Sequence, residues 1–590
     1  MEVLLWKLSA LSAESLTAPL IHSLALLSVL CWDYWFLLLV FLYRRVLNHD
    51  GLASYPHPLP NALLVIPSLL RTRAELTSMI STVRSVAHNG YPSELLVVVS
   101  IDGTDDQPSL YSELCDWADA EVLPRALQLY VTGTQMRRGK PMAIEHGFAL
   151  VKALVHKGEL RGVPQVYIST DADADLGKGA LANLVRRLVV PHPMTGWPAR
   201  AVSGNLFLRG DAFWPGFAGF FTIKGQLKLQ IARHYLVANL ARHNLRPVPM
   251  CGVPGVLYCT WSEIFLQAPK FLSFVQTLRF KDWLKWWLGA PPPAFERSAV
   301  TPKPELLAGD TDDTVTAFLA VFSVYRNGKF SLEFPRTPLH ALYAMLRGVF
   351  VDRALRYEPK AHVFTSSPET IRGLFKQRRR WNSARIEVTG RFWRGLFYHW
   401  TLGLPAVVIL WMVARSWICG AALYWLLPLA FFKASFLSAF VFGFVCHMLI
   451  IAVVTTFALV LNHQKKHWLM LWAAPLAPLY SLFFAYFPAL VGGVSDVFLF
   501  GNRTGFAPES TLIRGGSSRI ALAYRGKRAL LLAARALFRG DVPFGKFWFG
   551  WRETRWTPNG YEGWTSAQKP RPILAWSKRR TALHNDDDSS

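Results

Sequence analysis

The sequence predicts an α/β domain with a doubly wound, mostly parallel sheet, followed by an α-helical transmembrane bundle. Three observations favour this architecture. Short apolar runs alternate with helical patterns between residues 60 and 210, and apolar blocks of bilayer length follow residue 395. In addition, 52% of the 590 residues are hydrophobic, and the mean hydropathy is +0.22. Alternating strands and helices are typical of βαβ units, and about 20 apolar residues span a bilayer core.

Four buried strands are predicted from apolar runs at residues 63–67, 95–101, 127–131 and 166–169. Helical patterns follow the first three of them, at residues 73–88, 107–119 and 141–157. In such a sheet, ligands bind beyond the carboxyl ends of the strands. Polar residues that directly follow a strand are therefore the first candidates for a functional site.

The chain divides into four predicted parts. Residues 1–50 hold an N-terminal transmembrane segment, and the basic residues at its end predict that the following chain is cytosolic. Residues 51–395 form the expected cytosolic domain, residues 396–500 a bundle of about four helices, and residues 501–590 a basic cytosolic tail.

The bundle divides at its polar interruptions into four predicted spans, at residues 396–414, 417–433, 436–462 and 468–493. An even number of spans returns the tail to the cytosolic side. Two further segments, 271–288 and 518–539, combine apolar residues with basic ones, which favours helices lying in the headgroup layer. Ordinary surface or core helices are the alternative.

The charge of the chain limits its classes of partner. It carries 64 Lys+Arg against 39 Asp+Glu, a formal net charge of +25. A nucleic-acid-binding protein can carry such a charge, but several bilayer-length apolar blocks are not typical of that class, so we expect no nucleic-acid partner. A membrane protein with basic cytosolic faces accounts for both features. The six cysteines form no CxxC pair, which predicts free thiols.

Two of the predicted strands run directly into acidic residues. The second ends at Asp102, and the fourth continues into Asp171-Ala-Asp173. Two carboxylates that flank one small residue can bind a hard divalent cation. Because no His or Cys is adjacent in the sequence, Mg²⁺ or Mn²⁺ suits this motif better than zinc. A solvated acidic turn or an acidic helix N-terminus is the alternative.

A second acidic pair, Asp312-Asp313, precedes an apolar run that indicates a buried helix. Neighbouring carboxylates raise each other's pKa, which helps one of them to accept a proton from a hydroxyl group. A helix cap with additional acids in the first turn is the alternative.

Three shorter segments are weaker candidates. The basic run 137–140, which ends at Lys140, could reach a phosphate or a base, or could be a solvated loop. Glycine-containing turns are predicted at Ser203-Gly204 and at 251–255, where backbone could approach a sugar closely.

The segment Gln377-Arg-Arg-Arg380-Trp381 lies immediately before the apolar blocks. Guanidinium groups hold phosphate oxygens in a fixed fork, and the face of an indole is a stacking surface for a sugar ring. The segment therefore predicts a site for a sugar diphosphate at the membrane surface. A basic cluster that contacts anionic lipid is the alternative.

In this order, the motifs resemble those of the processive family 2 glycosyltransferases, which are the cellulose, chitin and hyaluronan synthases. The resemblance covers roughly residues 60–500, and it implies a GT-A-type α/β domain and a membrane bundle. Cys-Gly-Val-Pro-Gly at 251–255 and Gln-Arg-Arg-Arg-Trp at 377–381 are closest in spelling to chitin synthase.

The resemblance implies a donor site. Asp102 would contact the uracil of a UDP-sugar, and Lys140 would lie near the nucleotide. Asp171 and Asp173 would form the metal and diphosphate motif, with Asp173 as the direct ligand of Mg²⁺ or Mn²⁺. The diphosphate would also be held by two residues of the later motif, Gln377 and Arg380.

It also implies an acceptor site and a reaction. Asp313, with Asp312 beside it, would be the catalytic base, and Trp381 and Gly255 would contact the growing polysaccharide. The implied enzyme is an inverting hexosyltransferase of the plasma membrane with a cytosolic catalytic domain. It would use UDP-N-acetylglucosamine to build a β-linked, chitin- or hyaluronan-like polymer and move it across the bilayer.

Three alternatives stay open: a non-processive transferase with a lipid acceptor, a cellulose or glucan synthase that uses UDP-glucose, and an inactive transferase-like membrane scaffold. One departure bears on the donor site. The family's first strand continues as Pro-x-Tyr-Asn-Glu, whereas this chain has Pro67-Ser-Leu-Leu-Arg71 and so lacks the acid near uridine. Glu75 is not assumed to replace it.

Overall fold

The computed structural model of the chain describes residues 58–135, 140–191, 196–209, 220, 222–244, 255–293, 295, 312–343, 355–368, 370–375, 377, 378, 381, 395, 398, 434–461, 465–481 and 573–575. Several predictions fall on other residues. These are the N-terminal span, nearly all of the spans at 396–414 and 417–433, and the basic segment 518–539.

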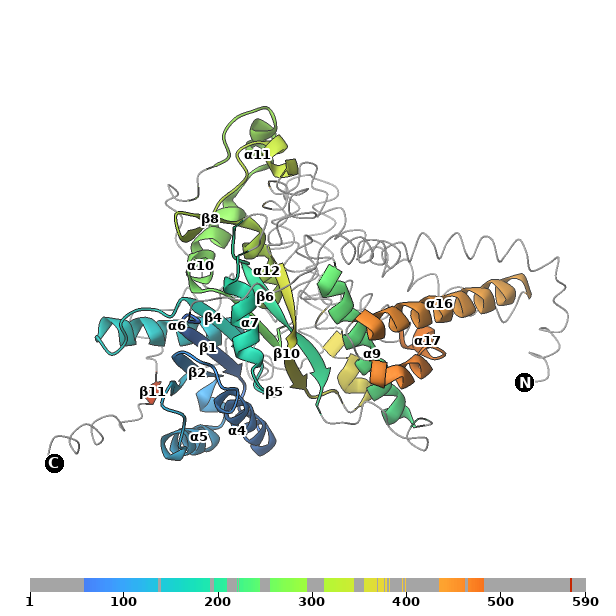
Figure 1. Cartoon of the computed structure of the whole chain (residues 1–590), viewed down its shortest axis with the longest axis horizontal. Coiled ribbons are helices and arrows are strands. Elements are labelled where there is room, and N and C mark those ends of the chain that lie inside the picture. The colour runs from blue at the N-terminus through green and yellow to red at the C-terminus, as the bar shows by residue number, and fades with distance from the viewer. Residues whose placement is uncertain are drawn as a thin grey trace, which may run out of the picture.

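A nine-stranded sheet forms the centre of the domain, with the strand order β11-β3-β2-β1-β4-β7-β6-β10-β5 (Figure 1). Its strands are β1 (Ala62–Ser68), β2 (Leu95–Asp102), β3 (Leu127–Thr134), β4 (Val166–Thr170), β5 (Ala174–Leu176), β6 (Ala201–Leu208), β7 (Leu257–Trp261), β10 (Leu355–Thr365) and β11 (Ile573–Ala575). A separate hairpin pairs β8 (Ser323–Arg326) with β9 (Lys329–Leu332).

The first half of the sheet confirms the sequence prediction. Strands β3, β2, β1 and β4 are parallel neighbours, with Val65 of β1 opposite Val98 of β2 and Ser169 of β4. The apolar runs that predicted β1, β2 and β4 are buried on both faces, as expected for parallel strands covered by helices, whereas residues 127–130 of β3 are only partly buried. The three predicted helices are present as α4 (Arg73–Ala87), α5 (Pro108–Ala120) and α6 (Lys140–His156).

The second half of the sheet is mixed, so the prediction of a mostly parallel sheet is wrong beyond β4. Strand β7 lies antiparallel between β4 and β6, β10 is parallel to β6, and β5 is antiparallel to β10. The predicted turn at Ser203-Gly204 is also wrong, because both residues lie inside β6. These pairings join distant segments, and the local apolar pattern does not encode them.

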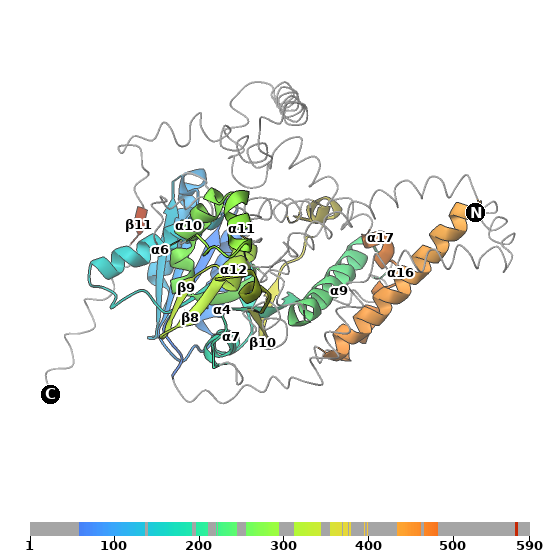
Figure 2. The same cartoon turned by 90° about the horizontal axis from the view of Figure 1, so that it is seen from above.

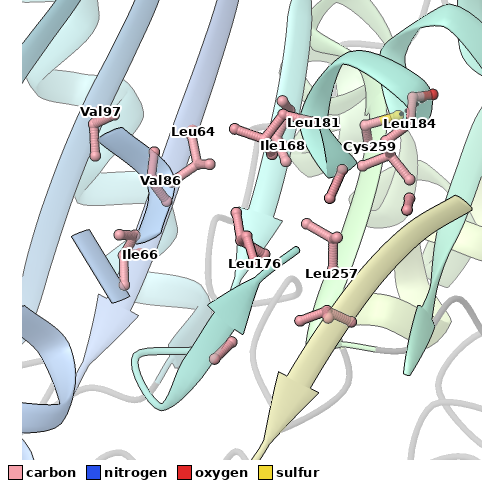
Figure 3. Close-up of a cluster of buried hydrophobic side chains, with 14 of the residues drawn as sticks. Leu64, Ile66, Val86, Val97, Ile168, Leu176, Leu181, Leu184, Leu257 and Cys259 are labelled. Atoms are coloured by element: carbon pink, nitrogen blue, oxygen red, sulfur yellow. Dashed lines mark hydrogen bonds between the residues drawn. The ribbon is translucent and has the colours of Figure 1, made fainter. Parts of the chain in front are cut away.

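Alternate residues of the central strands enter two apolar cores on opposite faces of the sheet. Leu63 and Val65 of β1 pack with α6, α10 (Ser262–Thr277) and α12 (Asp312–Phe322). Leu64 and Ile66 pack with α4, α5 and α7 (Ala180–Val189). Figure 3 shows part of this second core, where side chains from the strands meet Leu181 of α7.

The segment predicted to lie in the headgroup layer, 271–288, forms parts of two different helices. Its first part belongs to α10, where Phe271 and Val275 are fully buried in the core, so the prediction is wrong there. Its second part is α11 (Phe280–Trp287), which exposes Phe280 and Leu284. A surface position for this part fits both the predicted headgroup-layer helix and the alternative of an ordinary surface helix, so its place in the headgroup layer stays a prediction.

A second helical group lies beside the sheet (Figures 1 and 2). It contains α9 (Ile223–Asn244), α16 (Ala434–Leu461), the 3₁₀ helix η4 (Lys465–Ala473) and α17 (Ala477–Ser481). Leu229 of α9 packs with Ala458 of α16 and Met470 of η4 in a small core of their own. A short 3₁₀ helix, η1 (Thr104–Asp106), completes the described elements.

Helix α16 occupies the span predicted at 436–462, but no continuous helix begins at residue 468. The chain there forms η4 and turns at residues 474–476 before α17. Pro475 and Pro478 lack the N–H group that would extend a regular helix through this region. Within the described residues, no helix has the combination of length and hydropathy required to cross a bilayer. The four-span bundle stays a prediction.

Replacement of Gly204 by alanine is expected to destabilise the fold. A Cβ atom there would lie 2.9 Å from Leu257 Cδ2 and 3.0 Å from the carbonyl oxygen of Ala361. Forcing a methyl group into packed strands costs about 1–3 kcal/mol of unfolding free energy. Thermal denaturation of the purified full chain measures the effect. Gly162→Ala is the matched control, because nothing lies within 4 Å of a Cβ at that position. Equal melting temperatures for the two variants would contradict the packing of β6.

Candidate functional site

The winding of the sheet reverses beside β1, which has β2 on one side and β4 on the other. In doubly wound sheets, the crevice at such a reversal, beyond the carboxyl ends of the strands, is the usual ligand site. The predicted acids lie at this edge: Asp102 is the last residue of β2, and Asp171 directly follows β4.

Asp102 is buried at the end of β2, with 4% of its surface exposed. The Thr134 hydroxyl, at the end of the adjacent β3, donates a hydrogen bond to its Oδ1 over 3.4 Å. The backbone N–H of Gly103 donates to the Thr134 carbonyl over 3.0 Å, and Gly103 has a φ of +91°. Glycine adopts this left-handed conformation without strain, so the chain turns sharply after Asp102 into η1.

The structure brings together two residues that the sequence separates. Lys140, the first residue of α6, places its Nζ 2.7 Å from Asp171 Oδ1. Both side chains are partly shielded, with exposed fractions of 20% for Lys140 and 34% for Asp171. The ammonium group of Lys140 and the carboxylates of Asp171 and Asp102 therefore lie at the same edge of the sheet. This charge pattern suits an anion that binds together with a cation.

Asp173 lies beside the end of β10, far away in the sequence. Its Oδ2 accepts hydrogen bonds from the hydroxyls of Ser366, over 2.5 Å, and Thr365, over 3.4 Å. Burial raises the pKa of the Asp173 carboxyl, and the negative charge of Asp171 raises that pKa further, while the Ser366 hydrogen bond opposes the shift. Within the protein, the negative charge of the Asp173 carboxylate is therefore only partly compensated.

These carboxylates fit a divalent metal ion. Among the described residues no group of three or more His, Cys, Asp or Glu side chains is gathered around one point. Mg²⁺ in nucleotide sites commonly uses only one or two carboxylates and takes its remaining ligands from phosphates and water. Asp173 is only partly exposed, and the negative charge of Asp171 repels it, so its carboxylate would gain most from a bound cation. All donors here are oxygen atoms, as Mg²⁺ and Mn²⁺ prefer.

The third acid of this segment, Asp175, is engaged elsewhere. It lies in β5 and forms an ion pair with Arg209 over 2.5 Å, while Ser81 of α4 donates a hydrogen bond to it over 3.1 Å. These contacts attach β5 to α4 and to the end of β6. We therefore assign Asp175 to the fold rather than to the site.

The turn before β7 lies next to the acids. Gly255 is half-buried, and its neighbour Val256 accepts hydrogen bonds from the backbone N–H of Asp171, over 3.3 Å, and from the Thr170 hydroxyl, over 2.8 Å. The structure thus places Gly255 beside the carboxylate motif. The preceding residues 251–254 lie outside the described residues.

The segment after β1, Pro67-Ser-Leu-Leu-Arg71, lacks the acid that the family carries there, and the structure shows what the nearby Glu75 does instead. Thr72 is the N-cap of α4, and Glu75 completes a capping box with it. The Glu75 carboxylate also accepts hydrogen bonds from the Arg71 backbone over 2.7 Å and from the Arg71 guanidinium over 2.6 Å. Glu75 therefore stabilises the start of the helix, and the structure gives no support for a substitute acid at the nucleotide.

The predicted base lies at the start of a helix, as expected from the sequence. Asp312 and Asp313 open α12, and the following residues, from Val315 to Phe322, are largely buried. The structure describes the backbone of the two acids but not their side chains. Their catalytic role stays a prediction.

The Gln-Arg-Arg-Arg-Trp segment is described at three positions: Gln377, Arg378 and Trp381. Arg380 lies outside the described residues. The Gln377 Oε1 atom is buried and has no hydrogen-bond partner among the described residues, so it is available to a hydroxyl or amide donor. Trp381 is half-buried and packs against the same core as Ala172, the residue between Asp171 and Asp173.

Sequence reasoning missed Ser366, Thr365 and Arg209, which hold Asp173 and Asp175. Ser366 lies 193 residues from Asp173. Its only local signal is a pair of serines at the end of a strand pattern, which is common. The pairing of β10 with β5 and β6 brings this end to the acids.

Ser366→Ala is expected to weaken metal binding by about 10- to 100-fold, because outer-shell partners of ligating carboxylates contribute this much to affinity. Titration of the purified full chain with Mn²⁺, followed by electron paramagnetic resonance, measures the dissociation constant. Ser331→Ala is the matched control, since Ser331 likewise donates to a carboxylate, Glu333, over 2.7 Å. Unchanged Mn²⁺ affinity in Ser366→Ala would contradict the role of this contact.

No protein-family model matches the chain, and no curated protein matches it. Among solved structures, it is similar to the mannosyltransferase PcManGT from Pyrobaculum calidifontis in complex with GDP-Man and Mn²⁺. That match has 17% identity and a TM-score of 0.36, and it covers 79% of this chain and 98% of the other. A second match is GalNAc-T7 with UDP, GalNAc and Mn²⁺, at 14% identity and a TM-score of 0.17, covering 28% and 26%. Because these identities and TM-scores are low, the function of the chain is inferred from its own residues and not from these matches.

Proposed function

We propose that the chain is a metal-dependent glycosyltransferase that uses a nucleoside-diphosphate sugar. The observation that carries this proposal is the Lys140–Asp171 ion pair next to the half-buried Asp173, at the edge where the sheet reverses its winding. A diphosphate requires positive charge, and a metal bridging it to the protein requires carboxylate oxygens. This edge offers both, and Asp102, buried at the end of β2, is the proposed contact for the nucleobase.

The proposed reaction is a single displacement with inversion. Asp313 removes the proton from an acceptor hydroxyl, and the resulting oxygen attacks the anomeric carbon as the bond to the diphosphate breaks. An α-linked donor therefore yields a β-linked product. Lys140 and Arg380 stabilise the negative charge of the departing nucleotide. Bound Mg²⁺ or Mn²⁺, held by Asp173 and Asp171, would supply further charge neutralisation.

The proposed acceptor is a growing polysaccharide, and the proposed donor is UDP-N-acetylglucosamine. Support comes from the chitin-like spelling of the 251–255 and 377–381 segments, from the indole of Trp381, and from Gly255 beside the carboxylates. The side-chain carbonyl of Gln377, which has no hydrogen-bond partner within the described ranges, offers an acceptor for a sugar hydroxyl.

We further propose that the protein is an integral protein of the plasma membrane, that it extrudes the polymer, and that its catalytic domain is cytosolic. The apolar blocks of the sequence support this proposal. So do the exposed apolar side chains of two described helices, among them Phe280 and Leu288 at α11 and Leu449 and Val453 on α16. Lys281 and Lys285 on α11 provide basic groups suited to anionic headgroups.

A donor screen tests the proposed function. Membranes or detergent-solubilised full chain are incubated with radiolabelled UDP-N-acetylglucosamine, UDP-glucuronate or UDP-glucose, and the products are digested with specific glycanases. We expect a high-molecular-mass, chitinase- or hyaluronidase-sensitive product that EDTA abolishes and Mg²⁺ or Mn²⁺ restores. One sugar per lipid would instead indicate a non-processive enzyme, and a glucan would indicate UDP-glucose. No turnover of any donor would support an inactive scaffold, and activity in EDTA would contradict the metal.

Asp313→Asn is expected to lower polymer formation by about 10²- to 10⁴-fold, the usual contribution of a general base, while UDP binding survives. Product formation and UDP affinity are measured on the same preparation. Asp282→Asn is the matched control, because Asp282 lies in the first turn of α11 and caps it through the Arg279 backbone over 3.0 Å. Equal loss of catalysis and UDP binding in Asp313→Asn would reject the base assignment.

A further inference from the structure

The middle of the Gln-Arg-Arg-Arg-Trp segment contains a buried guanidinium that the proposed reaction does not use. Arg378 has only 6% of its surface exposed. A buried cation is costly unless its N–H groups and its faces find partners. Two partners of Arg378 belong to α9 and α17, which are distant in the chain, and the third is Trp381, three residues later.

Two contacts lie in the plane of the guanidinium group. Nη1 is 3.0 Å from Nε2 of His234, which belongs to α9, and Nη2 donates to the Tyr480 hydroxyl of α17 over 3.2 Å. Because a guanidinium has donors only, the His234 Nε2 must be the acceptor in its contact. The ring is then neutral, with its proton on Nδ1.

The third contact of Arg378 is with the face of the Trp381 indole. The Arg378 Cζ lies 4.4 Å from the centre of the Trp381 ring, within the range of a cation–π interaction. The two residues are three apart on one helical turn, so their side chains lie on the same side. With both hydrogen bonds in place, the guanidinium has few orientations open to it, and the indole is held against it.

The two helices that supply these partners are themselves connected. One turn before His234, Gln230 of α9 donates to the Ala473 carbonyl at the end of η4 over 2.6 Å. Arg233 is also held on α9, through Gln230 Oε1 over 3.2 Å. Tyr480 has only 7% of its surface exposed. The acceptor atoms around Arg378 are therefore built into packed elements and are not loose surface groups.

We propose that Arg378 is a positioning residue, which uses His234 and Tyr480 to fix the Trp381 indole as the platform for the terminal sugar of the acceptor. This inference rests on the proposed function, and it gives α17 and α9 a direct influence on acceptor binding. A lysine could not replace this arginine, because an ammonium group has neither a flat face nor a planar fork of donors.

The test compares acceptor and donor kinetics of the full chain, with a soluble oligosaccharide as the acceptor. Tyr480→Phe and His234→Leu each remove one hydrogen bond to a cation, and each is expected to raise the acceptor KM by about 10-fold. The donor KM should change less than about twofold, well below the effect of one hydrogen bond. His234→Gln retains an acceptor oxygen and should bring the acceptor KM back to within about threefold of that of the unaltered chain.

Tyr91→Phe is the matched control, because the Tyr91 hydroxyl is also buried and donates to the Pro60 carbonyl, near the start of β1. It removes a structural hydrogen bond and should leave the ratio of acceptor KM to donor KM unchanged. An unchanged acceptor KM in Tyr480→Phe and His234→Leu would overturn the proposal, and so would an equal rise in both Michaelis constants.

Thermal unfolding separates this proposal from the proposed function. Arg378→Lys and Tyr480→Phe should each lower the melting temperature, and the double variant should lose less than the sum of the two, because both remove the same contact. Additive losses would overturn the Arg378–Tyr480 contact on which the arrangement depends, even in an active enzyme. If the chain transfers no sugar but the losses of melting temperature are non-additive, the glycosyltransferase proposal is refuted. Arg378 would then only position Trp381.

Discussion

The pairing of β1 with strands on both of its sides is the constraint on which the site depends. β2 and β4 both run parallel to β1, so their carboxyl ends meet at one edge, and each of these ends carries an acid. The alternating side chains of β1 enter two separate cores, which fixes the register of both pairings, since a slip of one residue would exchange the buried faces. The positions of Asp102 and Asp171 follow from that register.

The acids after β4 show how partners decide the role of chemically identical side chains. Asp171 is paired with an ammonium group, Asp173 accepts hydrogen bonds from hydroxyls and has a raised pKa, and Asp175 is bound by a guanidinium. All three side chains are partly exposed, but Asp173 is held by hydroxyl groups rather than by a cation. A cation would be most stabilising at that position, whereas Asp175 already has its counter-charge and holds β5 in place.

Helix α9 connects this edge of the sheet to the C-terminal helices. It packs against α16 and η4, and its His234 contacts Arg378 in the segment that ends at Trp381. A buried guanidinium between neutral acceptors and an indole gives little net stability compared with an apolar side chain. Its value lies in orientation, because planar donors and a flat face allow few arrangements of the groups around them.

The sequence by itself determined the first four strands, their three helices and the acids at the strand ends, because apolar runs and their spacing are local properties. It also predicted where the buried helix α12 begins. It predicted neither the mixed half of the sheet nor Ser366, His234 and Tyr480. Their contacts join residues between 102 and 193 positions apart. Only the tertiary structure decided these contacts, since strand pairing and helix packing bring such residues together and no local pattern records which distant segments will meet.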